Sequence, residues 1–297
     1  VSVRLVSKVS SCTMSVEFWY MLPIGIVIAT VAMASGVGGA TFFSPLFILG
    51  LGLSPELAVG SGLVVEVFGF GSGVYAYVRR QLIDYRVGGM LLSATVPAAV
   101  AGVVIAHFAD ADLLKLILGM GLFAVAVSFL RAPDEETETA LNEMAHETPD
   151  EAETCLVSAD DEEICYTVCN TTEGRLISGI GGLFVGMVSS GLGELNGYFL
   201  LQRCRVPSSV AVATSVFVVA ITALIASAGH VIQVAQGGLT GLATMGNLLL
   251  FTAPGVVIGA QLGPALAERV PDRVMEIGLG VLFTITAGLL LFEAGLH

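Results

Sequence analysis

The chain of 297 residues has a composition that excludes an ordinary soluble domain. Apolar residues make up 55% of it, charged residues only 12%, and the mean hydropathy is +0.88. A chain this hydrophobic has lipid as its main solvent. The net charge of −13 gives no reason to expect a nucleic-acid partner, since nucleic acids attract basic proteins.

Long apolar stretches recur along the whole chain. A bilayer core about 30 Å thick needs roughly 20 apolar helical residues to cross it. The first and fifth stretches are too long or too rich in glycine for one regular helix, so each is interpreted as a broken or re-entrant helix. The sequence thus predicts an all-α polytopic membrane protein with eight to ten membrane segments. The stretches are Leu22–Leu53, Leu57–Val78, Val87–Phe108, Leu113–Leu130, Leu176–Leu201, Val210–Ala228, Leu239–Leu266 and Val274–Phe292.

The chain contains two related halves. Several short matches follow one another in the same order at a nearly constant offset, which chance similarity between membrane helices does not readily give. We predict an extension (1–20), a first membrane repeat (21–131), a linker (132–175) and a second repeat (176–297), each repeat being a glycine-broken helix followed by three transmembrane helices. The matches pair Ser35–Gly39 with Ser190–Glu194, Ala58–Gly62 with Ala211–Ser215, and Pro97 and Gly102 with Pro254 and Gly259.

The positions of the arginines predict how the halves are oriented. Cytoplasmic loops of membrane proteins are rich in Lys and Arg, and here the basic loops of one half correspond to nearly bare loops in the other. We therefore expect inverted repeats in the cell membrane, with both termini outside and the linker in the cytoplasm, an arrangement typical of transporters. The loop arginines are Arg79, Arg80 and Arg86 in the first half and Arg203, Arg205, Arg269 and Arg273 in the second.

The linker accounts for most of the negative charge. Residues 131–175 hold fourteen acidic side chains and two arginines. Two short apolar runs around 159–163 predict a small β-hairpin, with a flexible connector as the alternative. Because a cytoplasmic linker would keep its thiols reduced, we expect no structural disulfide. The spacing of its cysteines and His146 matches no common zinc pattern, so no metal or other cofactor is expected.

The two glycine clusters are the main candidate site. Gly36, Gly38 and Gly39 in the first half, and Gly191 and Gly193 in the second, permit backbone geometries that leave N–H groups free for an anion. Irregular backbone at membrane depth is tolerated only when it is buried in protein or lines a wet cavity. Two equivalent breaks therefore predict one shared substrate cavity. The alternative is close helix packing through glycine.

Hydroxyl groups follow each break at equivalent positions. Ser61 in the first half, and Thr214 with Ser215 in the second, lie in early turns of the next predicted helix. These groups are candidates for donating hydrogen bonds to a substrate oxygen. The alternative is a hydrogen bond back to a carbonyl of their own helix.

Glu66 and Glu194 are the ionisable residues closest to the membrane interior. A charge there is costly and indicates a functional role by default, so both are candidates for proton coupling, with Glu194 preferred because it lies in the second break. Glu66 has a protonated packing role as its alternative. No Lys or Arg lies inside a hydrophobic block except Lys115, near an end, so anion binding would depend on N–H groups and hydroxyls.

An enzyme is not expected. The sequence has no H-E-x-x-H motif, and Gly60–Gly62 combined with His107 or His230 is a weak basis for a serine–histidine intramembrane protease.

The ordered, duplicated motifs resemble the sulfite exporter TauE/SafE family of membrane permeases. The resemblance is carried by Gly36–Gly39 with Pro45, by Pro55 with Ala58–Ser61, by the matching second-half stretches Gly191–Gly193 and Ala211–Ser215, and by Gly259–Gly263. It implies transport of small sulfur-containing anions such as sulfite, thiosulfate or organosulfonates without a bound cofactor.

Two features depart from that pattern: Glu194 stands where the family tends to have another glycine, and the linker is long. A charged Glu194 would repel an anion, so we expect it to be protonated during transport. Two other functions stay open: a membrane-embedded regulator or sensor that uses the acidic linker, and a transporter of a non-anionic solute. The substrate, the direction of transport, the coupling ion and the oligomeric state do not follow from the sequence.

Overall fold

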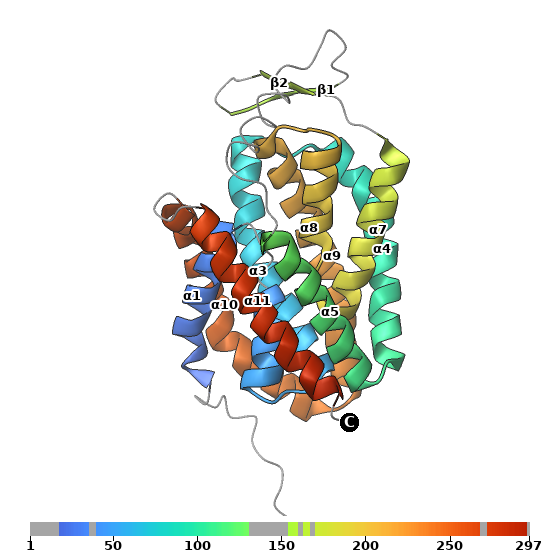
Figure 1. Ribbon diagram of the computed structural model, residues 1–297, viewed down its shortest axis with the longest axis vertical. Helices are drawn as coiled ribbons and strands as arrows, with labels where there is room; N and C mark the ends of the chain where they lie inside the picture. Colours follow the sequence, from blue (N-terminus) through green and yellow to red (C-terminus); the bar gives the residue numbers. More distant parts are fainter. Residues whose placement is uncertain are drawn as a thin grey trace, which may run out of the picture.

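The computed structural model describes residues 18–35, 40–130, 154–159, 163–166, 170–267 and 272–295. These residues form a bundle of helices with a small hairpin at one end (Figure 1). Helices of similar length follow one another in the same order in each half. The first half contains α1 (Met21–Ser35), α2 (Ala40–Pro45), the π-helix η2 (Leu46–Gly50), α3 (Pro55–Arg80), α4 (Tyr85–Phe108) and α5 (Ala111–Leu130), and the second contains α7 (Thr171–Val188), α8 (Leu192–Gly197), the π-helix η3 (Tyr198–Arg203), α9 (Ser208–Gln236), α10 (Leu239–Ala267) and α11 (Asp272–Gly295).

The helices agree with the predicted class of polytopic membrane protein. Among the described residues, five helical stretches are long and apolar enough to cross a bilayer, and Met21–Met33 and Ala40–Gly50 are shorter apolar stretches. The larger predicted count of eight to ten stays a prediction. Helix α7 begins at Thr171, inside the segment that the sequence assigned to the linker. The five long stretches are Pro55–Arg80, Tyr85–Phe108, Ser208–Gln236, Leu239–Leu262 and Ile277–Ala294.

Local sequence sets where α3 begins and ends and where α4 begins. Pro55 opens α3, where its fixed φ suits a first helical turn, and Gln81 ends the helix in the left-handed conformation with φ 56°. The Asp84 carboxylate then caps α4 by accepting hydrogen bonds from the backbone N–H groups of Arg86 and Val87. The turn between α3 and α4 is therefore closely defined.

Glycines bring the two halves together backbone to backbone. Helix α1 packs along α10, where a methyl group at Gly255 would come within 2.5 Å of the Leu22 carbonyl oxygen. Helix α7 packs along α4 in the same way, and a methyl group at Gly182 would come within 2.5 Å of the Thr95 carbonyl oxygen. Small residues that permit such close approach are typical of membrane helix interfaces.

The centre of the bundle is the antiparallel pair α3 and α9. A methyl group at Gly60 would lie 3.1 Å from the Cβ of His230, whereas one at Gly73 would lie 3.5 Å from Val216. The contact residues thus run in opposite directions along the two helices. Helices α5 and α11 also run antiparallel, with Lys115 of α5 paired to Glu293 near the end of α11 at 3.5 Å.

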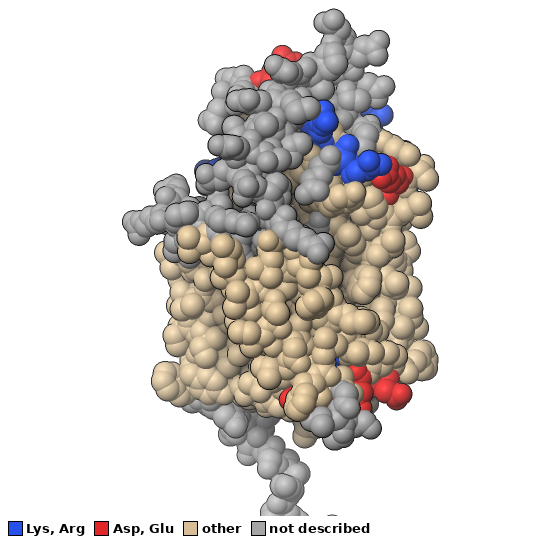
Figure 2. All heavy atoms as spheres, in the orientation of Figure 1, with Lys and Arg blue, Asp and Glu red and all other residues tan. Residues whose placement is uncertain are grey.

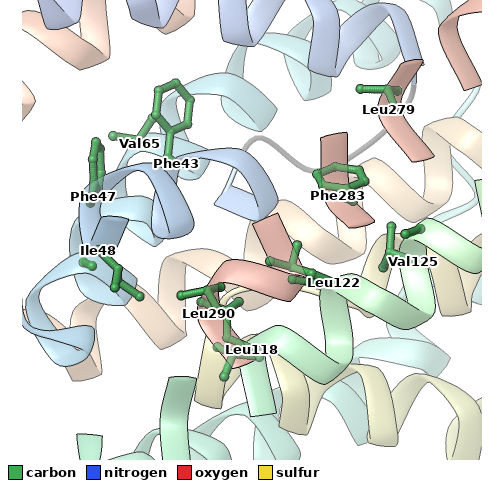
Figure 3. Packing of buried hydrophobic residues seen from close by; sticks show 14 of the residues in the cluster. Phe43, Phe47, Ile48, Val65, Leu118, Leu122, Val125, Leu279, Phe283 and Leu290 are labelled. Atoms are coloured by element: carbon green, nitrogen blue, oxygen red, sulfur yellow. The ribbon is translucent and has the colours of Figure 1, made fainter. Parts of the chain in front are cut away.

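Apolar side chains fill the space between α2, η2, α5 and α11. Figure 3 shows part of this cluster, in which Leu118 and Leu122 of α5 lie close to Leu290 of α11. The outer surface of the bundle is also apolar, and the Lys, Arg, Asp and Glu side chains visible in Figure 2 gather at its two ends. This distribution is the one expected for a protein surrounded by lipid.

The linker contributes a two-stranded antiparallel hairpin at one end of the bundle. Strands β1 (Thr154–Val157) and β2 (Glu163–Tyr166) place Cys155 directly opposite Cys165. The two sulfurs are bonded to each other at 2.01 Å. The expectation of no structural disulfide was therefore wrong, because it considered only the compartment and could not see that the hairpin register makes the cysteines cross-strand neighbours.

The backbone contact between α4 and α7 gives a stability prediction. A Cβ at Gly186 would collide with the Ala99 carbonyl, so we expect Gly186→Ala to destabilise the protein by about 1–3 kcal/mol. Gly121→Ala is the matched control, because a Cβ at Gly121 meets open space and alanine favours helix. Thermal unfolding in detergent would measure both. Equal melting temperatures for the two variants would contradict the close packing of α4 on α7.

Candidate functional site

The chain leaves the helical conformation at the predicted break of the second half. Helix α7 ends at Val188, Ser189 adopts the left-handed conformation with φ 61°, and Gly191 has φ 104° before α8 begins at Leu192. Glycine is the residue that adopts such a φ without a steric cost. Gly193, by contrast, lies inside α8. The first-half glycines Gly36, Gly38 and Gly39 lie outside the described residues.

A buried pair of serines joins this break to the other half. The hydroxyls of Ser44, on α2, and Ser189 are 2.6 Å apart, and neither side chain has exposed surface. Ser189 Oγ donates to the Val188 carbonyl at 2.6 Å, so its single proton is used and Ser44 is the donor to Ser189. A Cβ at Gly62 of α3 would collide with the Ser44 hydroxyl. Gly62 therefore makes room for the serine pair.

Ser61, the residue before Gly62, contributes a further buried hydroxyl. Its side chain is fully buried, and its Oγ makes no hydrogen bond within the described part of the structure. The alternative role, a bond back to its own helix, is therefore not observed. A buried hydroxyl without a partner costs about 1–3 kcal/mol, which is tolerated at a site where a ligand supplies the partner.

Glu66 lies one helical turn beyond Gly62 and is 4% exposed. It lines a cavity of about 10 Å³ together with Ala32 and Met33 in the last turns of α1. A cavity of this size holds about one water molecule. Glu66 is thus placed between α1, α3 and α10, close to the C-terminal end of α1. Glu194 belongs to α8, but its side chain is outside the described part of the structure.

Thr214 lies away from this centre. Its Oγ1 accepts a hydrogen bond from the Asp84 backbone N–H at 3.0 Å, at the turn between α3 and α4. Because α3 and α9 are antiparallel, Ser61 and Thr214 are separated by about 20 Å along the pair, at roughly 1.5 Å per residue. Ser215 is also buried on α9. The structure therefore does not bring the predicted hydroxyls into one cluster.

Further polar residues surround the second break, and sequence reasoning missed the serine pair Ser44 and Ser189 among them. Asn196 of α8 accepts a hydrogen bond from Ser178 at 2.7 Å, and its Nδ2 has no partner among the described residues. The His230 ring lies 2.8 Å through Nε2 from the Gly186 carbonyl near the end of α7. His230 is thus not hydrogen-bonded to Ser61, and no serine–histidine pair is formed. The signal that could have identified Ser189 was its position two residues before Gly191, whereas Ser44 lies five residues after Gly39 and has no such signal.

Helices that are interrupted inside a membrane bundle, as between α7 and α8, occur in many polytopic membrane transporters. Residues 21–290 match the family model described as Sulfite exporter TauE/SafE, and the chain belongs to that family. This confirms the resemblance noted in the sequence.

Two Bacillus subtilis (strain 168) proteins are similar along nearly their whole length. YunE, named a probable membrane transporter protein, is 22% identical over 285 residues, which cover 93% of this chain and 98% of YunE. YjnA, also named a probable membrane transporter protein, is 26% identical over 251 residues, or 82% of this chain and 90% of YjnA. No solved structure matches. The protein is thus a membrane transporter of this family and not an enzyme.

The two second-half glycines provide a matched test of the break. We expect Gly191→Ala to destabilise the protein by about 1–3 kcal/mol, because alanine at φ 104° is strained. Gly193→Ala should be neutral or slightly stabilising, because it lies in a helix with open space around it. Chemical or thermal unfolding in detergent would compare them. If both substitutions were neutral, the positive φ at Gly191 would not be required.

Proposed function

We propose that the protein is a permease for small anions, sulfur oxyanions such as sulfite, thiosulfate or organosulfonates in the first place. The observation that carries this proposal is the fully buried Ser61 hydroxyl, which has no hydrogen-bond partner within the described part of the structure and is therefore free to donate to a substrate oxygen. Hydroxyl and backbone N–H groups bind the oxygens of an anion without adding a fixed charge to the membrane interior. The name of the family adds sulfite as the first anion to test.

We infer that the two halves are inverted repeats, as the sequence predicted. Helix α1 runs parallel to α10, as the contacts of Gly255 with Leu22 and of Thr30 with Gly259 require. Gly60 and Gly69 of α3 contact Met245 and Val256 of α10, so α3 is parallel to both.

The direction of α7, the first helix of the second half, follows from contacts of the same kind. Gly182 and Gly186 of α7 contact Thr95 and Ala99 of α4, so these helices are parallel. Helix α4 is in turn parallel to α9, since Gly88 contacts Phe217 and Val103 contacts Gly229. Because α9 is antiparallel to α3, helix α7 runs opposite to α1. This pattern supports a pseudo-twofold axis in the membrane plane, with the site between the repeats.

We place the hairpin end of the bundle in the cytoplasm. Arg79 and Arg80 end α3, Arg86 begins α4 and Arg203 ends η3, all near the hairpin end where basic side chains are visible in Figure 2. Basic residues next to membrane spans are retained on the cytoplasmic side. The acidic linker would then be cytoplasmic as well.

Proton coupling through Glu66 and Glu194 is the extension of this proposal. A charged carboxylate beside the break would repel an anion, whereas the protonated form would not. Anion and proton would therefore move together. A transporter of a non-anionic solute is the second candidate, favoured by the buried Glu66 carboxyl group beside its water-sized cavity.

The role of Ser61 gives the first functional prediction. Ser61→Ala removes a hydroxyl that has no partner in the structure, so the melting temperature should stay constant or rise. Transport of radiolabelled sulfite or thiosulfate into proteoliposomes should fall about tenfold to a hundredfold, the effect of one lost hydrogen bond to a charged group. Ser93→Ala is the control, because Ser93 is exposed on α4 and bonds only to its own helix. Unchanged transport in Ser61→Ala would reject Ser61 as a binding residue.

Glu66→Gln separates the two candidate functions. The amide resembles the protonated carboxyl group, so an anion transporter should keep its activity and lose its acceleration by acid on this substitution. A transporter that attracts a cation through the carboxylate should lose activity instead. Uptake measured between pH 5 and pH 8, with sulfite, acetate and monovalent cations as competitors, distinguishes these results. Anion transport that stays fully dependent on pH in Glu66→Gln would remove Glu66 from the coupling mechanism.

A further inference from the structure

The linker hairpin is attached directly to the turn between α3 and α4. The Ala159 backbone N–H donates to the Arg80 carbonyl at 3.0 Å. The Tyr166 hydroxyl donates to Asp84 Oδ2 at 2.6 Å. Asp84 in turn caps α4 and bonds through its own N–H to Thr214 of the second half. The hairpin therefore contacts the first half directly and is linked to the second half through Asp84.

Tyr166 is the hairpin residue that is buried in the bundle at this end. Although it belongs to the linker, its side chain is only 1% exposed and is one of the largest fully buried side chains of the described structure. It belongs to the same buried cluster as Leu200 of η3, Val206 and Val210. Burial, and then the hydrogen bond to Asp84, raise the pKa of the Tyr166 hydroxyl well above its usual value, so the phenol stays a neutral donor at physiological pH.

Tyr166 thus lies between two parts of the bundle that a transporter with inverted repeats has to move apart. Inverted-repeat transporters expose their site by moving one part of the bundle against the other. A bulky side chain buried between the α3–α4 turn and the η3–α9 region opposes such a movement at this end.

The hairpin needs support to hold Tyr166 there. Each strand has only four residues, and an isolated two-stranded hairpin is marginally stable in water. The disulfide between Cys155 and Cys165 crosses the two strands directly before Tyr166. Cys155 is exposed, so a reductant can reach the bond. The sulfurs bonded to each other are not available as thiolate ligands for a metal.

We propose that the Cys155–Cys165 disulfide is a redox modification site, and that its state decides whether the hairpin keeps Tyr166 sealed between the two halves. The disulfide form is the closed form, and the dithiol form releases the hairpin. The proposal deepens the proposed function, because it assigns a control element to one end of the permease. The reactant is a dithiol reductant, present on the cytoplasmic side where we place the linker.

The reaction is an ordinary thiol–disulfide exchange. A thiolate of the reductant attacks Cys155 Sγ, the bond between the two cysteines breaks, and Cys165 leaves as a thiolate that takes up a proton. The second thiol of the reductant then attacks the mixed disulfide and releases Cys155. Two electrons and two protons pass to the protein, and the reductant becomes a disulfide. An oxygen of the Glu163 carboxylate lies within 4.8 Å of both sulfurs, and its negative charge opposes the attacking thiolate.

Hydrogen–deuterium exchange of the purified full-length protein tests the proposal without any substrate. Peptides that contain the Asp84 and Ala159 amides should be protected in the oxidised protein, because both amides are hydrogen-bonded. After reduction with dithiothreitol, we expect their exchange to become at least about tenfold faster. Alkylation and peptide mass would verify that the bond between Cys155 and Cys165 is cleaved. Unchanged protection in verified reduced protein would overturn the proposal.

Three variants control the experiment. Cys155→Ser with Cys165→Ser should exchange quickly with or without dithiothreitol, and it also isolates effects of Cys204, which is disulfide-bonded as well. Slow exchange in this double variant would show that the disulfide does not hold the hairpin. Tyr166→Phe should weaken protection around Asp84 while the disulfide stays intact. Glu163→Gln should be reduced faster than the parent, with unchanged protection before reduction.

Transport assays add a separate result. Proteoliposomes with the hairpin facing the reductant should show faster uptake of labelled sulfite after reduction, and the double cysteine variant should be insensitive to it. If exchange responds to reduction but sulfite does not move in any form, the redox control stands and the choice of substrate fails. If sulfite moves at the same rate in both redox states, the proposed control fails and the proposed function stands.

Discussion

The peptide groups of Ser189, Ser190 and Gly191 leave the helix inside a bundle that lipid surrounds, and the arrangement of the centre follows from this constraint. Lipid supplies no hydrogen bonds to free N–H and C=O groups, so such a segment persists only where protein encloses it. Here Ser44 of the opposite half bonds to Ser189, and His230 bonds to the Gly186 carbonyl near the end of α7. The second break is thus enclosed by the first half and by α9, which explains why neither half would be expected to function alone.

Enclosing a break in this way requires helices to approach closely on all sides. Gly62 leaves the space for Ser44, and Gly182 and Gly186 bring α7 against the backbone of α4. A helix break and close packing through glycine therefore both occur in the described structure, but at different positions. Gly191 has a positive φ and sits in the break, whereas most other glycines in the described helices act through the small size of their side chains.

The hydrophobic stretches and glycine clusters of the sequence predicted the helical membrane class and the position of the second break, and its ordered motifs resembled the family to which the chain belongs. They did not predict the serine pair, because the contact of Ser44 with Ser189 depends on how α2 lies against α7, and no local pattern encodes that. The matching positions in the two halves also gave one wrong expectation, that the hydroxyls of Ser61 and Thr214 would lie together. Ser61 and Thr214 match in sequence, yet the antiparallel packing of α3 on α9 places them at opposite ends of the pair. Thr214 supports the Asp84 turn, while Ser61 lies in the buried centre.

The hairpin end combines two features that favour opposite sides of a membrane. Arginines such as Arg79, Arg80 and Arg203 favour the cytoplasm, whereas a lasting disulfide favours an oxidising compartment. If the bond between Cys155 and Cys165 were purely structural, the arginine distribution of both halves would have to be inverted relative to the usual rule. If the bond instead forms and breaks, both features are satisfied at the cytoplasmic side. Tyr166 follows Cys165 directly and is buried against both halves. Under the proposal, breaking the Cys155–Cys165 bond therefore also releases the side chain that closes this end.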